Sequence, residues 1–232
     1  MTPLRIVATA FCLLGCRAES VVGLIDEHRP AVEKTFGAIR LIQLPLANHE
    51  TPAVPLVLQT PTKDGVNAMF IYGEDLAKPG GAKAVPLRTM DSLALVQCGS
   101  LLDTEKLFPG APQTRLMQVT LTPPLARGYL SACARLRYVL IIQGTAFKAP
   151  QVTTDANFSP GLFRADVAAV DLSSGKPVGA FQVEAVNTSG VTIVSGEDRE
   201  QRLLRDLEGA IYNALREGTR QAFPGSMPPP SL

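Results

Sequence analysis

The feature that most constrains the fold is a pair of strand-like segments followed by a helix-like segment in the C-terminal third of the chain. In GLFRADVAAVDL, apolar side chains alternate from Phe163 to Ala169, and in PVGAFQVEAV they alternate from Phe181 to Ala185. Alternation with a period of two places these side chains on one face of each strand. Because the turn residues SSGKP separate the two segments, the pattern predicts a β-hairpin with one apolar face.

Residues 197–223, EDREQRLLRDLEGAIYNALREGTRQAF, have the pattern of one long amphipathic helix. Their apolar side chains recur at steps of about four: Leu203 or Leu204, Leu207, Ile211 and Leu215. Glu197, Asp198 and Glu200 fall in the first turn, where negative charge complements the helix dipole. The apolar stripe has to cover a sheet, and the preceding hairpin is the nearest one. We therefore predict an α+β fold, a mostly antiparallel sheet with helices packed against it.

The remaining elements are predicted from shorter patterns. Apolar runs bounded by turn residues predict strands at 55–59, 67–73, 114–122 and 191–194. The segment 91–102 fits either a buried strand or a short helix. Helices are expected to begin at Pro30 and at Pro123-Pro124, because proline is favoured in the first helical turn. The continuous apolar run in RYVLIIQG predicts a central strand that is covered on both faces.

Charge and composition exclude some classes of partner. Lys and Arg number 22 against 21 Asp and Glu in 232 residues, and tryptophan is absent. Nucleic-acid binding draws on clustered positive charge, so we expect no nucleic-acid partner. The 46% hydrophobic content indicates a folded chain that can bury a core. We assign residues 31–223 to a single α+β domain and expect the Pro-rich tail, residues 224–232, to be disordered.

The N-terminus has the layout of a signal peptide. Arg5 precedes the uncharged run IVATAFCLL, which is shorter than the ~20 residues that span a bilayer. We therefore predict an N-terminal signal peptide and no transmembrane helix. At the end of the apolar run, Leu13-Leu14-Gly15-Cys16 resembles the lipobox of bacterial lipoproteins, and this resemblance implies that residues 1–15 are the signal peptide.

The resemblance to lipoproteins implies a specific modification. In that family, diacylglycerol is attached to the cysteine thiol, the chain is cleaved before the cysteine, and the new amine is acylated. Carried over to this chain, the lipidation site is Cys16, and the chain would be held in a membrane by fatty chains such as palmitate. Arg17, in place of aspartate after the cysteine, favours the outer membrane, with the domain facing the periplasm. Residues 16–30 would then form a tether.

Two cysteines remain in the predicted mature chain, Cys98 and Cys133. An even pair in an oxidising periplasm predicts a disulfide, although two buried free thiols would also fit the sequence. Two isolated cysteines and the distant His28 and His49 lack the spacing of a metal site. We therefore expect neither a bound metal nor another cofactor.

Catalytic motifs are not evident in the sequence. There is no G-x-S-x-G elbow, and both histidines fit surface positions. Asp166 and Asp171 lie five apart on a predicted strand, so their carboxylates should point to opposite faces. The leading hypothesis is a non-enzymatic envelope lipoprotein that serves another envelope protein as an assembly, adaptor or transport-accessory factor. A hydrolase with an unrecognised carboxylate or serine site and a small-ligand or glycan sensor stay open as alternatives.

The polar face of the C-terminal helix is the candidate partner surface. It carries five arginines interspersed with acids: Arg199, Arg202, Arg205, Arg216 and Arg220. These could bind an acidic partner or lipid headgroups, whereas mixed charges of this kind also occur on ordinary solvated faces.

Overall fold

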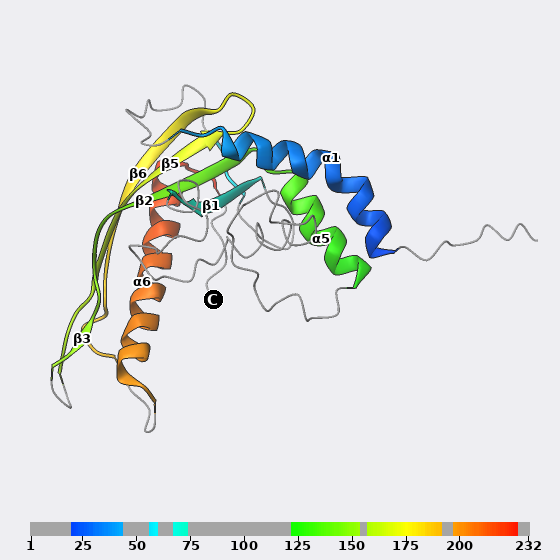
Figure 1. The fold of residues 1–232 in the computed structure, drawn as a ribbon. Helices are drawn as coiled ribbons and strands as arrows, with labels where there is room; N and C mark the ends of the chain where they lie inside the picture. The colour runs from blue at the N-terminus through cyan, green and yellow to red at the C-terminus, as the bar shows by residue number, and fades with distance from the viewer. Residues whose placement is uncertain are drawn as a thin grey trace, which may run out of the picture.

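Four strands form the central sheet, in the order β1-β2-β5-β6 (Figure 1). In a computed structural model, the chain is described over residues 20–43, 56–59, 67–73, 122–153, 157–191 and 197–226. The strands are β1 Ala68–Tyr72, β2 Tyr138–Lys148, β5 Leu162–Asp171 and β6 Lys176–Val186. β1 runs parallel to β2, and the other two pairs are antiparallel. A small second sheet pairs β3 Gln151–Val152 with β4 Phe158–Ser159.

The predicted hairpin is present as β5 and β6. Its register pairs Val167 with Phe181 and Ala165 with Val183, as one shared apolar face requires. The turn is closed by the N–H of Gly175, which donates to the carbonyl of Asp171 at 2.8 Å. Gly175 has a φ of 67°, a left-handed conformation that glycine adopts without steric cost. The SSGKP segment therefore turns the chain as predicted.

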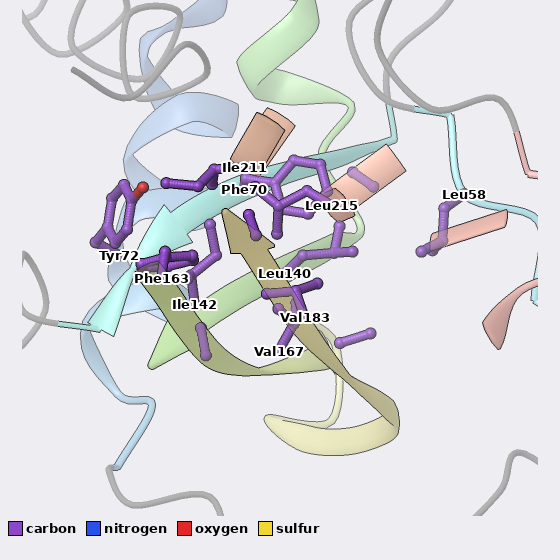
Figure 2. Packing of buried hydrophobic residues seen from close by; sticks show 14 of the residues in the cluster. Leu58, Phe70, Tyr72, Leu140, Ile142, Phe163, Val167, Val183, Ile211 and Leu215 are labelled. Carbon is purple, nitrogen blue, oxygen red and sulfur yellow. The ribbon is translucent and has the colours of Figure 1, made fainter. Parts of the chain in front are cut away.

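One face of the sheet is covered by α6 Arg199–Ala222. The predicted stripe of Leu203, Leu207, Ile211 and Leu215 is buried. Figure 2 shows Ile211 and Leu215 against strand side chains such as Phe70. We call this cluster the α6-side core, and its strand members come from all four strands: Ala68, Phe70, Tyr72, Tyr138, Leu140, Ile142, Phe163, Ala165, Val167, Ala169, Val183 and Ala185.

The other face is covered by two helices, α1 Val21–Arg40 and α5 Pro123–Ala134. They pack against each other and against the sheet, with Phe36 and Leu130 fully buried. We call this cluster the α1/α5-side core, and its strand members are Met69, Ile71, Val139, Ile141 and Val170. Helices thus cover both faces of part of a mostly antiparallel sheet, and a long amphipathic helix follows the C-terminal hairpin. The predicted α+β class is confirmed.

The helix predicted to begin at Pro30 begins at Val21 instead, so Pro30 lies inside it. An internal proline removes a backbone hydrogen bond and costs ~3 kcal/mol. The cost is offset because Ser20 caps the helix, accepting from Gly23 N–H at 3.1 Å, and because buried residues from Leu24 to Ile39 lie on both sides of the proline. The part of the predicted tether from Val21 to Pro30 is therefore helical.

The tail also differs from its prediction in the part that is described. Phe223 is buried, and its ring meets that of Phe181 edge to face at a centroid distance of 6.3 Å. Ser226, the third residue of the predicted disordered tail, is buried and accepts from Leu58 N–H at 2.9 Å through its hydroxyl. A phenylalanine and a hydroxyl with a backbone partner dock residues 223–226 on the domain, despite Pro224.

Some predicted elements lie in other parts of the chain. Segment 91–102 and most of 114–122 and 191–194 are outside the described residues. Residues 56–59 form no regular strand, although the Gln59 carbonyl accepts from Asn67 N–H at 2.8 Å. No helix in the described ranges is long and apolar enough to cross a membrane.

Candidate functional sites

The predicted lipidation site, Cys16, lies outside the described residues, but the start of α1, a few residues later, is described. The N-cap of α1 is Ser20, so only residues 17–20 separate Cys16 from the first helical turn. That turn carries no acidic side chain, and Val22 is 67% exposed in it. A lipid at Cys16 would therefore be joined almost directly to the folded domain.

Cys133 lies on α5 in the α1/α5-side core and is fully buried. It is disulfide-bonded, and its partner is not among the described residues. Cys98, like Cys12 and Cys16, lies outside the described residues, so the Cys98–Cys133 pairing stays a prediction.

The outward face of α6 holds the five candidate arginines in different surroundings. Arg205 lies 3.3 Å from a Glu197 carboxylate oxygen and donates to Gln201 Oε1 at 2.8 Å. Arg216 stacks over the Tyr212 ring with its guanidinium carbon 5.8 Å from the centroid. These contacts along one helix hold the guanidinium groups in place and leave Arg205 exposed.

The other three arginines are distributed along the same helix. Arg220, near the C-terminal end, is exposed and pairs with Glu217. Arg199 and Arg202 are partly buried. The Nε of Arg202 is buried without a hydrogen-bond partner, while its charge acts on the nearby Asp206 carboxylate. The partner role of these arginines stays a prediction.

Asp206 is the centre of a polar cluster that the sequence analysis did not find. Its Oδ2 accepts from Asn187 Nδ2 and from Thr188 N–H, each at 2.9 Å, and its Oδ1 accepts from the Thr188 hydroxyl. Asn187, which is buried, also donates to the Leu203 carbonyl and accepts from Gly161 N–H at 2.7 Å. The cluster therefore fastens the ends of β5 and β6 to α6.

The ionisation of Asp206 reflects this geometry. Burial raises its pKa, but the hydrogen bonds from Asn187 and Thr188 and the charge of Arg202 outweigh burial and hold the pKa below its ordinary value. The carboxylate is thus kept charged as an acceptor inside the fold. A sequence signal existed in the polar pair Asn187-Thr188, which directly follows an apolar strand.

The two carboxylates considered for catalysis have separate surroundings. Asp166 accepts from Gln182 Nε2 at 2.9 Å across the β5–β6 pair. Asp171 closes the hairpin turn, accepting from Ser173 N–H at 2.7 Å, and lies 3.6 Å from Arg137. Burial raises the pKa of Asp171, but the hydrogen bonds from Ser173 and the charge of Arg137 outweigh burial. The pKa of Asp171 is therefore below its ordinary value. The structure does not bring the two carboxylates together.

His28 is more enclosed than the sequence suggested. Its Nδ1 lies 3.1 Å from the Leu24 carbonyl oxygen and its Nε2 lies 3.2 Å from the Ser131 hydroxyl, so the ring links α1 to α5. His49 is outside the described residues. Within the described ranges, no three His, Cys, Asp or Glu side chains are grouped so that they could hold a metal ion.

No protein-family model matches the chain, and no curated protein matches it.

Proposed function

We propose that the chain is a cell-envelope lipoprotein, anchored through lipid on Cys16 and held at the outer membrane facing the periplasm. Its folded domain acts without chemistry of its own, as an assembly, adaptor or transport-accessory factor for another envelope protein. The observation that carries the proposal is the series Leu13-Leu14-Gly15-Cys16 at the end of a nine-residue apolar run, four residues before α1.

The position of α1 supports the anchor. A lipoprotein cysteine becomes the first residue of the mature chain, so the residues directly after it lie close to the bilayer surface. Residues 17–20 are followed by a capped helix whose first turn carries Val21 and Val22 and no acidic side chain. An anionic membrane surface repels carboxylates, so an uncharged first turn fits this location.

The contacts of the described carboxylates support a binding role over catalysis. Asp206 fastens a helix to strands, Asp171 closes a turn, and Asp198 caps α6 by accepting from Glu200 N–H at 3.0 Å. Each of these groups has a stabilising task in the fold. Arg205 and Arg220 are exposed on α6, each beside a glutamate with which it pairs, and we take these two side chains as the contacts to an acidic envelope protein.

The anchor is tested by two cysteine variants of the full chain expressed in a bacterium with an outer membrane. Cys16→Ser should abolish incorporation of labelled palmitate, leave the signal peptide uncleaved and remove the chain from the detergent phase. Cys12→Ser is the matched control, because Cys12 lies in the discarded apolar run, and it should behave as the parent. Unchanged maturation and partition of Cys16→Ser would refute the anchor.

The adaptor role is tested separately by crosslinking in living cells. The double variant R205E/R220E should lose a crosslinked envelope protein that the parent chain captures. Arg135→Glu, at an exposed position at the end of α5, is the control for reversing a positive charge outside α6 and should keep the crosslink. Equal crosslinking by all three chains would show that the α6 face is not the partner surface.

A further inference from the structure

The beginnings of α1 and α5 form one end of the molecule. The two helices pack side by side and run in the same direction, so that their first turns lie at the same end (Figure 1). His28, the eighth residue of α1, contacts Ser131, the ninth residue of α5, which fits two parallel helices whose starts are aligned. We call this region the helix-start end, and it comprises Val21, Val22, Gly23, Pro123, Pro124 and Leu125.

The helix-start end is uncharged and partly apolar. Val22 is 67% exposed and Leu125 is 40% exposed, two of the five large hydrophobic side chains that are exposed among the described residues. Neither helix has an acidic residue in its first turn. Exposed apolar side chains that gather in one place suit a contact with another surface better than with water.

The flank of α1 is charged, with both signs present. Asp26, Glu27 and Glu33 are exposed along it, but so are Lys34 and Arg40. Placing this flank in the interface of a bilayer would strip water from these charges, which costs free energy. An end-on approach through the uncharged first turn avoids that cost.

The length of the connection decides what the helix-start end can reach. The four residues after Cys16 span at most about 14 Å when fully extended. By contrast, α6 alone has 24 residues, which corresponds to about 36 Å. If Cys16 sits at the bilayer surface, the first turn of α1 cannot leave its vicinity.

We infer that the short connection holds the helix-start end against the phospholipid surface, with Val22 and Leu125 at headgroup depth. The opposite end of the molecule, where β3 and the beginning of α6 lie (Figure 1), then points into the periplasm. The inference deepens the proposed function and depends on the lipid at Cys16. The helix-start end contacts the bilayer rather than a protein, because the segment that precedes α1 carries the lipidated Cys16.

The orientation is tested by fluorescence, since the chain has no tryptophan and one substitution gives one fluorophore. Lipidated V22W, L125W and F158W variants are reconstituted into phosphatidylethanolamine–phosphatidylglycerol vesicles with or without brominated phosphatidylcholine. Bromine should quench V22W and L125W strongly. F158W, on β4, is the matched control and should show the same emission in both kinds of vesicle.

A linker insertion tests the role of the short connection. A Gly/Ser segment of 20 residues placed between Glu19 and Ser20 has a root-mean-square reach of about 25 Å. It should leave the chain membrane-bound and reduce quenching of V22W to the level of F158W. Quenching that persists would show that the end adheres by itself, which contradicts the inference.

The failures are distinguishable. If Cys16→Ser does not change membrane partition, the proposed function fails before orientation is measured. If the lipidated chain is membrane-bound but V22W and F158W are quenched alike, the anchor stands and the orientation is refuted.

Discussion

The central sheet is covered on both faces in one half and on one face in the other. In the two-sided half, residues 68–72, 138–142 and 167–171 are all buried, because α6 packs on one face and α1 and α5 on the other. In the one-sided half, residues 143–148 and 162–166 have burial that varies along the strand. Phe147, Phe163 and Ala165 there pack on the α6 side.

The difference explains why one strand carries two kinds of sequence. β2 begins with the continuous apolar run Tyr138–Ile142 and continues with Gln143 and Thr145. An irregularity in the register between Gly144 and Ala146 adds a residue, so that Phe147 still meets Phe163 on the α6 side. A change from continuous to alternating pattern within a strand thus marks where a covering layer ends.

The strongest test of the comparison uses two positions on the same face of β2. Ile141 is fully buried under α1 and α5, and Gln143 is the next residue on that face. Ile141→Ala should lower the free energy of unfolding by about 2–5 kcal/mol, through lost burial and a cavity. Gln143→Ala should change it by no more than about 0.5 kcal/mol. Urea unfolding followed by circular dichroism measures both, and equal losses would contradict a one-sided half.

The disulfide of Cys133 provides the next largest effect, since it belongs to the helical layer of the two-sided half. Peptide mapping without reductant should recover Cys133 linked to Cys98. Closing a loop of about 35 residues should contribute roughly 3–4 kcal/mol in the chain-entropy model, and Cys98→Ser should lose it. Reductant should then destabilise the parent and leave Cys98→Ser unaffected. A linked peptide containing Cys12 or Cys16 would refute the pairing.

Patterns that reflect direct burial were predictable from the sequence. The alternation in β5 and β6, the stripe of α6 and the continuous run in β2 each follow from which faces are covered, and all three are confirmed. The start of α1 differs from its prediction at Pro30 because buried apolar residues lie on both sides of the proline, Leu24 before it and Val32 after it. A local steric rule was overridden by tertiary packing.

Interactions between distant polar residues were not predictable. Asn187 and Asp206 lie 19 positions apart, and nothing in either segment alone indicates that a buried amide will meet a helix carboxylate. Ser226 in a Pro-rich tail is a similar case, because its hydroxyl accepts a hydrogen bond from Leu58 N–H, 168 positions away in the sequence. The candidate partner surface was located on α6, but its pairings with Glu197 and Tyr212 depend on side-chain geometry that spacing does not fix.

The polar cluster of the one-sided half is tested through pH. Asp206→Asn places an amide N–H₂ opposite donors from Asn187 and Thr188 and should cost about 1–2 kcal/mol at pH 7. The folded pKa of Asp206 is lowered, so its stabilisation is present above the unfolded pKa of about 3.9 and is lost as pH falls through the folded pKa. The gap between parent and variant should therefore close below about pH 4.

Glu208→Gln is the control for this experiment, because it removes a carboxylate from the same helix outside the cluster. Its stability relative to the parent should vary far less with pH. A constant gap between parent and Asp206→Asn from pH 7 to pH 2 would show that the carboxylate charge does not contribute.

Two glycines of α6 test the packing of this helix, which covers one face of the sheet in both halves. A Cβ on Gly218 would lie within 2.5 Å of the Phe181 ring, whereas a Cβ on Gly209 would meet nothing within 4 Å. Gly218→Ala should cost about 1–3 kcal/mol by displacing the ring. Gly209→Ala should stabilise the helix by up to about 1 kcal/mol. Thermal unfolding shows whether each variant is more or less stable than the parent. Stabilisation by Gly218→Ala would show that the Phe181 ring moves away at no cost.

The smallest effect is expected on the uncovered face of the one-sided half. Arg164 and Glu184 are directly opposite in the β5–β6 register and lie 2.6 Å apart, but their side chains are 54% and 57% exposed. Solvent screens such a pair, so a double-mutant cycle with Arg164→Ala and Glu184→Ala should give a coupling energy of about 0.2–1 kcal/mol. Adding 1 M salt should reduce it, because the Debye length then falls to about 3 Å. A coupling above about 2 kcal/mol that resists salt would mean that this face is desolvated, and the sheet would then be two-sided throughout.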